Sequence, residues 1–364
     1  MNRRVRADNR QEQRSASGLA AAECDDSLAP FLLLASFMSN LALKFALQRN
    51  RSEPLDALRG LAISLVIARH YFGFKYGMLG VDLFFVLSGF LIGGILLDSR
   101  EQPGYFSSFY GRRAFRILPL YWLLLVLLPP DHWGYYLLFV QAVPWLQFGF
   151  PQSDLTFVTW TLAIEEQFYL ILPILIYWLP QQWLVRVLWG GILLAPAWRW
   201  LFHSYLPDQS WQFLLPGRLD ELFGGVLLAC FARGYCRSAI AWAMLACVPP
   251  LCDVAYAAIV EAFAFLSVTA FVCCAIVWLG ANIERPQLLR PLVWPGRRCY
   301  SLYLFHMVVY DVFFDLGRPL SGLVALPIVC ILAEISWRLI EAPLINYARR
   351  SFARVETTPL GWVG

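Results

Sequence analysis

Charged residues are scarce in this chain of 364 residues, where Asp, Glu, Lys and Arg make up only 15% against roughly a quarter in soluble domains. Hydrophobic residues make up 59%, and the mean hydropathy is +0.57. A chain with 27 Phe, 15 Trp and 16 Tyr can place these rings against lipid and at membrane interfaces. The composition therefore predicts a membrane protein and excludes a secreted disulfide scaffold, a disordered chain and a nucleic-acid-binding module.

Lysine and paired cysteines are also lacking. Lysine occurs only at positions 44 and 75, so the net charge of +4 depends on the arginines. The nine cysteines lie mostly in or beside apolar runs, without a Cys-x-x-Cys pair or a neighbouring histidine. We expect buried free thiols and no metal site. The chain opens without the basic, apolar and small-residue pattern of a signal peptide, so we expect none to be cleaved.

Apolar runs account for most of the chain. A helix needs about 20 residues to cross a hydrocarbon core of about 30 Å. The predicted spans are 55–73, 77–97, 115–130, 160–180, 184–202, 216–232, 239–252, 255–280, 299–316 and 320–340. We therefore predict an all-α, polytopic membrane protein with about ten transmembrane helices.

The arginines indicate the orientation of these spans, because cytoplasmic loops are enriched in Lys and Arg. If residue 55 lies on the cytoplasmic side, that side also receives the arginine-rich segments 100–116, 186, 233–237, 285–298 and 349–354. The outer loops then carry little beyond Lys75 and Arg318. We predict that both termini are cytoplasmic.

The chain divides into three predicted parts. Residues 1–50 form a polar N-terminal extension, in which 28–47 is either an interfacial helix or a further span. A span there would place five arginines outside, which favours the interfacial helix. Residues 51–345 form the membrane domain, and 346–364 form a cytoplasmic tail. We expect the outer stretch 131–159 to dip into the membrane interface.

Arg59 and His70 lie eleven residues apart in the first predicted span. Eleven helical steps place them within about 20° of one face and about 16 Å apart along the axis. A cation near the inner surface is thus aligned with an imidazole in the outer half of the bilayer. Alternatively, each side chain reaches the headgroups of its own leaflet, with no shared purpose.

Carboxylates are also predicted at membrane depth, where charge is costly and usually functional. We expect Asp82 at a depth close to His70, where it could hold the imidazole tautomer, or where it simply favours the start of a helix. Glu165 and Glu166 are adjacent, so at least one is expected to face a polar interior rather than lipid. Such a carboxylate suits general acid or base catalysis, unless interfacial water solvates both.

Two further groups stand out. Arg112, Arg113 and Arg116 cluster at the start of a helix, as a guanidinium array for phosphates or as an anchor to anionic lipid. In the ninth predicted span, His306 follows Ser301 and Tyr303 and is more simply interpreted as a structural hydrogen-bond donor.

These segments resemble the acyltransferase-3 family of integral membrane O-acyltransferases, which modify bacterial lipopolysaccharide, exopolysaccharide and related glycans. Seven motifs match in order between residues 54 and 345: LDALRGLAISLVIARH, GVDLFFVLSGFLI, FYGRRAFRILPLYW, WTLAIEEQFYL, GRLDELFGGVLLA, YSLYLFH and IEAP. The chain departs from the family at Thr161, where Ser is common, and at Phe305, where Trp is frequent. No hydrolase-like domain follows the last predicted span, so we expect the stand-alone form.

The resemblance implies an enzyme that takes an acyl group, usually acetyl, from cytoplasmic acetyl-CoA and delivers it to a hydroxyl on the extracytoplasmic face. Arg59 and His70 become the signature pair, and the arginines at 112, 113 and 116 become contacts to coenzyme A. The expected acceptor is a polysaccharide or a lipid-linked oligosaccharide, and the expected location is the bacterial inner membrane. No metal or nucleic acid is expected.

The catalytic candidates are His70, as base or transient acyl carrier, and Asp82, Glu165 and Glu166, of which Asp82 or one of the two glutamates is expected to orient His70. A transporter or flippase of an acyl donor or lipid-linked glycan is the alternative, because buried charges also line permeation routes. The aromatic residues expected in outer loops either stack on sugar rings or form an interfacial belt; they include Trp133, Tyr135, Trp145 and Trp211.

Overall fold

The computed structural model describes residues 53–148, 157–203, 213–235, 266–281, 287–317 and 319–352. All regular structure in these ranges is helical, which confirms the predicted all-α class. The predicted N-terminal extension 1–50 and the predicted span 239–252 lie outside the described residues.

Long helices coincide with the predicted apolar runs. They are α3 (Glu53–Phe72), α4 (Leu79–Ser99), α5 (Tyr105–Leu127), α9 (Trp160–Trp178), α10 (Gln181–His203), α11 (Leu219–Ala232), α14 (Leu266–Ala281), α16 (Cys299–Val312) and α17 (Leu320–Ser336). The clearest difference is α5, which begins at Tyr105 although the apolar run begins at residue 115. Arginine is a good helix former, so the polar start of α5 is helical although hydropathy does not detect it.

Short elements join these helices. They are α6 (Trp133–Leu137), α7 (Ala142–Phe148), α15 (Arg290–Arg297), α18 (Ala342–Ser351), the 3₁₀ turns η1 (Lys75–Met78), η3 (Leu215–Arg218), η4 (Gln287–Leu289) and η5 (Phe314–Leu316), and the π-helical turn η6 (Trp337–Glu341). Because α17, η6 and α18 follow one another without a break, the predicted domain end at residue 345 falls inside α18.

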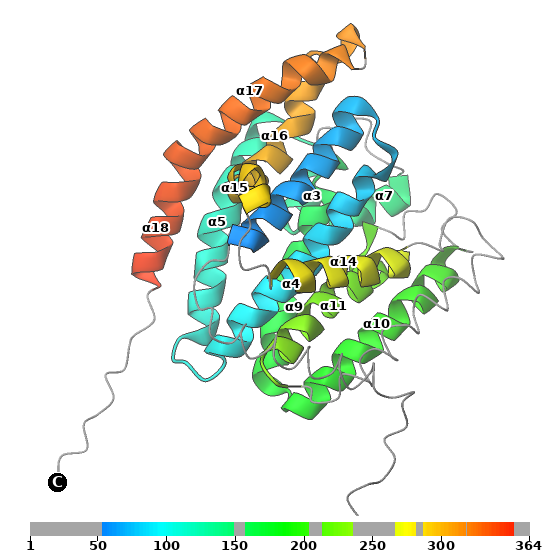
Figure 1. The fold of residues 1–364 in the computed structure, drawn as a ribbon, viewed down its shortest axis with the longest axis vertical. Helices are drawn as coiled ribbons and strands as arrows, with labels where there is room; N and C mark the ends of the chain where they lie inside the picture. Colours follow the sequence, from blue (N-terminus) through cyan, green and yellow to red (C-terminus); the bar gives the residue numbers. More distant parts are fainter. Residues whose placement is uncertain are drawn as a thin grey trace, which may run out of the picture.

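Helices α3 and α4 form the centre of the bundle, and the turn η1 joins them (Figure 1). Helix α11 packs along α4, and α10 packs on α11. On the other side, α15 and α16 pack against α3, and α17 continues into α18 along the edge of the molecule, where α18 lies beside α5 (Figure 1). Five segments that are distant in sequence, α3, α4, α5, α9 and α16, thereby surround a common interior.

Helices α4 and α11 come into backbone contact where glycine faces backbone. A Cβ added at Gly89 would lie 2.0 Å from the carbonyl oxygen of Leu222, and one at Gly225 would lie 2.2 Å from that of Val86. Small residues permit this approach between helices at membrane depth. The contact brings the two helices together beside Ser88, which directly precedes Gly89.

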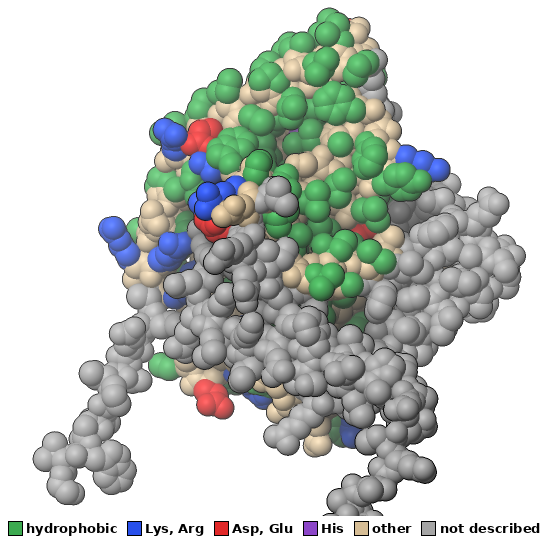
Figure 2. Space-filling view, in the orientation of Figure 1, with side chains coloured by type: hydrophobic (Ala, Val, Ile, Leu, Met, Phe, Trp, Pro, Cys, Tyr) green, Lys and Arg blue, Asp and Glu red, His purple; other side chains and the backbone are tan. Residues whose placement is uncertain are grey.

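The outer surface is apolar, as a membrane protein requires. Large side chains such as Val126, Leu339 and Trp178 are 76%, 72% and 67% exposed. Hydrophobic side chains cover the part of the surface formed by α16 and α17, while Lys and Arg gather near α15 and α18 (Figure 2). Two described stretches, Lys75–Ser99 and Leu320–Ser351, are long and apolar enough to span a bilayer. The number of spans and the side of each terminus stay predictions.

Replacing Gly89 with alanine should destabilise the protein, because the new methyl group collides with the backbone of α11. Overpacking of this kind costs about 1–3 kcal/mol. Gly190→Ala is the matched control, since a Cβ there meets nothing within 4 Å. Thermal unfolding of the detergent-solubilised variants measures the difference, and equal stability of the two would contradict the backbone contact.

Candidate functional site

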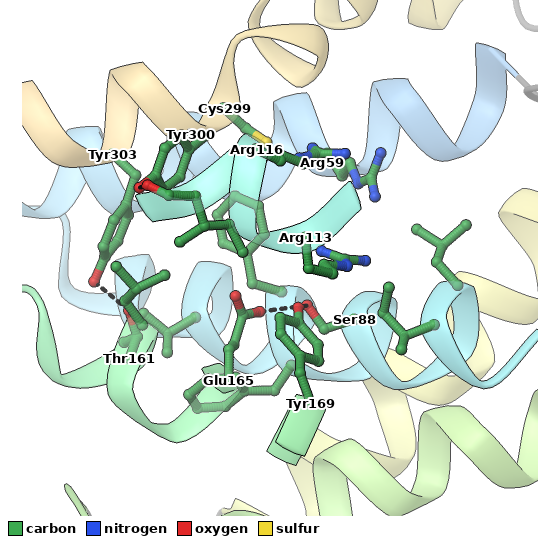
Figure 3. Close-up of a pocket in the computed structure, with 17 residues that line it drawn as sticks. Arg59, Ser88, Arg113, Arg116, Thr161, Glu165, Tyr169, Cys299, Tyr300 and Tyr303 are labelled. Carbon is green, nitrogen blue, oxygen red and sulfur yellow. Dashed lines mark hydrogen bonds between the residues drawn. The ribbon is translucent and has the colours of Figure 1, made fainter. Parts of the chain in front are cut away.

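A cavity in the common interior gathers residues from five helices (Figure 3). Its polar lining consists of Arg59, Ser88, Arg113, Arg116, Thr161, Glu165, Tyr169, Tyr300 and Tyr303. Four of the residues singled out in the sequence, Arg59, Arg113, Arg116 and Glu165, are thus brought together. Glu165 lines the same cavity as the arginines. His70, the expected base, does not line it.

The three arginines give this cavity a strong positive charge. Arg59 lies 3.6 Å from Asp56, and the guanidinium of Arg113 lies over the ring of Tyr169, 4.5 Å from its centroid. Among the described residues, no carboxylate lies within ion-pair distance of Arg113 or Arg116. A cation inside a helical bundle is costly unless it is paired. The cavity therefore suits an anionic ligand, because guanidinium groups bind phosphate and carboxylate well.

A hydroxyl and a carboxylate meet beside these arginines. Ser88 Oγ donates a hydrogen bond to Glu165 Oε1 and accepts one from the Tyr169 hydroxyl at 3.1 Å (Figure 3). A carboxylate hydrogen-bonded to a hydroxyl is placed to take or return a proton. Sequence reasoning missed Ser88 and Tyr169, although the spacing of four between Glu165 and Tyr169 places both on one helix face.

The far end of the cavity is closed by hydroxyl groups. Thr161 Oγ1 donates to the Tyr303 hydroxyl at 2.7 Å, and that hydroxyl donates to the carbonyl oxygen of Val158 at 2.6 Å. Figure 3 shows this pair apart from Arg59 and Arg113, with Glu165 between them. The lining therefore passes from cations through a carboxylate to neutral hydroxyls.

His70 lies next to a second histidine rather than in the cavity. Its ring centroid is 5.2 Å from that of His306, which lies one helical turn beyond Tyr303 on α16. His306 is fully buried, and its Nδ1 lies 2.6 Å from the carbonyl oxygen of Tyr303. This contact assigns the proton to Nδ1. Nε2 is then an acceptor, and it has no hydrogen-bond partner among the described residues.

The His306 backbone is itself held from α3. The Tyr71 hydroxyl donates to the His306 carbonyl oxygen at 2.7 Å, and the Tyr71 ring stacks on Tyr310 with centroids 5.1 Å apart. Because Tyr71 directly follows His70, one short segment of α3 positions both imidazoles.

Asp82 occupies a buried ion cluster. Its Oδ1 lies 3.1 Å from Nη1 of Arg218, and Arg218 also pairs with Glu221 at 2.9 Å. Arg199 pairs with Asp220 beside them, again at 2.9 Å. We expected Asp82 close to His70, but its ion pair is with Arg218. The acidic neighbours of Arg218, two and three positions later, were the signal in the sequence that we overlooked.

The remaining candidates lie at the edges of the cavity. Glu166 is absent from its lining, but its charge interacts with Arg113, and its Oε1 has no hydrogen-bond partner among the described residues. Arg112 does not line this cavity, and its Nη2 donates to the carbonyl oxygen of Phe352 at 2.5 Å. Arg112 thereby holds the end of α18.

The aromatic residues of the outer stretch 131–159 have different environments. Trp133 is 59% exposed, whereas Trp145 is buried and stacks on Phe157 with centroids 5.3 Å apart. Trp145 therefore packs in the core, and Trp133 is available to an interface or a sugar. Trp211 lies outside the described residues.

The cysteines in the described ranges form no disulfide; they are Cys230, Cys273, Cys274, Cys299 and Cys330. Cys230, Cys273 and Cys299 are buried, as expected, and Cys299 lines the cavity. No group of His, Cys, Asp or Glu suited to a metal ion occurs within these same ranges.

Comparison with known families identifies this bundle. A family model described as an acyltransferase domain matches residues 53–336, which include every helix that lines the cavity. The chain belongs to the acyltransferase-3 family. The match confirms the resemblance inferred from the motifs and makes the bundle an acyltransferase domain.

Relatives of this acyltransferase-3 protein include the peptidoglycan O-acetyltransferase OatA of Listeria monocytogenes, 29% identical over 82% of this chain and 57% of that protein. The "Putative membrane-bound transacylase BcsY" of Komagataeibacter xylinus is 29% identical over 83% of this chain and 85% of that protein. The chain thus spans little more than half the length of the Listeria relative. No solved structure matches it.

Replacing Arg218 with methionine should destabilise the protein by about 3–5 kcal/mol, because Asp82 and Glu221 would be left buried without their cation. Arg233→Met is the control, since its partner Asp98 is 56% exposed and such pairs contribute at most about 1 kcal/mol. Denaturant or thermal unfolding in detergent distinguishes the two. Normal stability of Arg218→Met together with loss of turnover would instead make the cluster part of the catalytic machinery.

Proposed function

We propose that this acyltransferase-3 protein is a membrane O-acetyltransferase. It transfers an acetyl group from cytoplasmic acetyl-CoA to a sugar hydroxyl of an extracytoplasmic polysaccharide or its lipid-linked precursor, of the exopolysaccharide or O-antigen type. The observation that carries the proposal is the cavity in which Arg59, Arg113 and Arg116 lie beside the Ser88–Glu165 pair. The likeness to the Listeria relative, which is named a peptidoglycan O-acetyltransferase, supports acetyl transfer to a glycan.

The donor fits the distribution of charge. Coenzyme A is an anionic nucleotide joined to a long, mostly uncharged pantetheine arm. If its phosphates stay with the arginines, the arm can extend between the helices toward Thr161 and Tyr303 without carrying phosphate into hydrocarbon. The thioester then enters a region lined by Glu165 and neutral hydroxyls.

Acyl transfer needs a base and a route for one proton. In direct transfer, the base takes the hydroxyl proton, the sugar oxygen attacks the thioester carbonyl, the C–S bond breaks, and the protonated base returns the proton to the thiolate, so that coenzyme A leaves as its thiol. His70 serves as that base, or alternatively as a transient acyl carrier. Glu165 and Glu166 supply the further proton-carrying groups.

The sequence suggested that Asp82 or a glutamate of the fourth predicted span orients His70. Asp82 is engaged by Arg218, whereas the ring of His306 lies against His70 with its Nε2 available as an acceptor. An acceptor beside an imidazole favours the tautomer whose N–H points at it. We therefore assign to His306 the role of orienting His70. The proposed location of the enzyme is the bacterial inner membrane.

Purified protein in detergent, given labelled acetyl-CoA and a glycan acceptor, should release free coenzyme A and label the acceptor without any membrane gradient. A transporter or flippase of the donor or of a lipid-linked glycan would do neither. A thiol-reactive dye and a filter assay for the glycan measure the two products.

His70→Ala should lower the rate of acceptor labelling by about 100-fold or more, the range expected for loss of a general base. His132→Ala is the control, because His132 is exposed outside the cavity. Wild-type acetylation by His70→Ala would refute both roles proposed for this imidazole.

Glu165→Gln and Glu166→Gln should reduce kcat by about 10-fold or more while the amount of folded protein in membranes holds, because an amide cannot take a proton. Size-exclusion profiles and single-turnover rates measure folding and chemistry separately. Loss of folded protein would show that the carboxylates are structural.

A further inference from the structure

A second cavity opens between the C-terminal end of α4, the N-terminal half of α5 and the helix α18. Arg113 and Arg116 line both cavities, so the second begins where the first ends. Arg112 and Arg349 complete a set of four arginines, and no Asp or Glu occurs among the described residues that line this cavity. Four cations around one hollow create a field that attracts an anion.

Helix α18 is held tightly enough to form a wall of this cavity. Its last residues lie on α5, where the absence of a side chain at Gly111 lets the ring of Phe352 approach the backbone. The Phe352 carbonyl oxygen accepts hydrogen bonds from Arg112 Nη2 at 2.5 Å and from Ser108 Oγ at 3.3 Å. Phe115 packs on Tyr347, with ring centroids 5.2 Å apart. These contacts fix the register that directs Arg349 into the cavity.

Arg349 stands apart from the family's domain. The matched domain ends at residue 336, so Arg349 lies outside it. Its neighbour Arg350 carries the same charge on the same helix, but Arg350 does not line the cavity. Among the described residues, no carboxylate lies within ion-pair distance of Arg349. Arg349 is therefore a cation that lines a hollow in which the described residues supply no counter-charge.

The other lining residues suit a nucleoside. Tyr105 and Phe109 present aromatic surface, and Ser99 and Gln102 present hydrogen-bonding groups. Oε1 of Gln102 is buried without a hydrogen-bond partner among the described residues. Aromatic rings stack with purine bases, while arginine pairs with phosphate oxygens through two parallel hydrogen bonds. Cations, aromatic surface and an unused acceptor together match a phosphorylated adenosine.

We infer that this second cavity binds the 3′-phosphoadenosine diphosphate end of the acyl donor, and that Arg349 is a phosphate-binding residue. The inference rests on the proposed function, in which the donor is acetyl-CoA. The two cavities then divide the donor between them. The nucleotide stays between α5 and α18, and the pantetheine arm passes Arg113 and Arg116 toward Glu165.

The experiment compares Arg349→Gln with Arg350→Gln, using acetyl-CoA and acetyl-pantetheine as donors. Acetyl-pantetheine lacks the nucleotide and its phosphates, so only the reaction with acetyl-CoA should respond to Arg349. Arg349→Gln should raise KM for acetyl-CoA roughly tenfold, as expected for loss of a charge-assisted hydrogen bond, and leave kcat and KM for acetyl-pantetheine unchanged. Arg350→Gln should leave all of these values at the wild-type level.

Several results would overturn the inference. Equal effects of the two variants would show attraction by general surface charge, and an equal rise in KM for both donors would show a disturbance of the bundle. If Arg349→Gln has the same KM and kcat as the wild type, Arg349 does not bind phosphate. The proposed function would still hold in that case, provided that the wild type labels the acceptor. If the wild type transfers acetyl from neither donor, the proposed function fails first.

Direct binding separates nucleotide from lipid phosphate, which shares the same chemistry. Adenosine 3′,5′-bisphosphate should raise the unfolding temperature of the wild type and of Arg350→Gln, and raise that of Arg349→Gln less. The assay is repeated in nanodiscs with and without phosphatidylglycerol. If Arg349 binds lipid headgroups instead, phosphatidylglycerol should stabilise the wild type more than Arg349→Gln, while the bisphosphate stabilises both equally, and that result would overturn the inference.

Discussion

The cost of burying charge inside a helical bundle governs this structure. A buried ion must be paired within the protein or by a ligand, because lipid and apolar side chains cannot solvate it. At Arg218 the protein supplies the partners itself, through Asp82 and Glu221. At Arg113 and Arg116 no described carboxylate lies within ion-pair distance, and both side chains face open cavities. Arginine thus serves both the structural ion cluster and the proposed binding cavities. In the cluster the protein supplies the counter-charge, and in the cavities a ligand would supply it.

Close helix packing places these two kinds of site side by side. The glycine contact between α4 and α11 brings Asp82 to Arg218, and it leaves Ser88 on α4 facing Glu165 across the cavity. A looser approach of the two helices would separate the ion cluster and misplace Ser88 together. The structural ion cluster therefore supports the geometry of the cavity, although Arg218 does not line it.

His70 and His306 form a pair of imidazoles outside the first cavity. Tyr71 holds the backbone of His306 while the preceding residue presents its imidazole, so α3 and α16 form one unit there. The pair does not line the first cavity, and Tyr303, which does line it, contacts His306 with ring centroids 5.5 Å apart. Such an order suits a donor that enters from the charged end and an acceptor that arrives at the imidazoles.

The sequence by itself determined the helical class, most helix positions, the family and four residues of the cavity, because apolar runs and ordered motifs are local in the chain. It placed Arg59 and His70 on one face of a helix, but helical spacing carries no information on which other helices lie alongside. Only the tertiary structure decided that Asp82 pairs with Arg218, that Ser88 meets Glu165, that His306 contacts His70 and that Arg349 faces a cavity. Each is a contact between distant segments, set by how the helices pack.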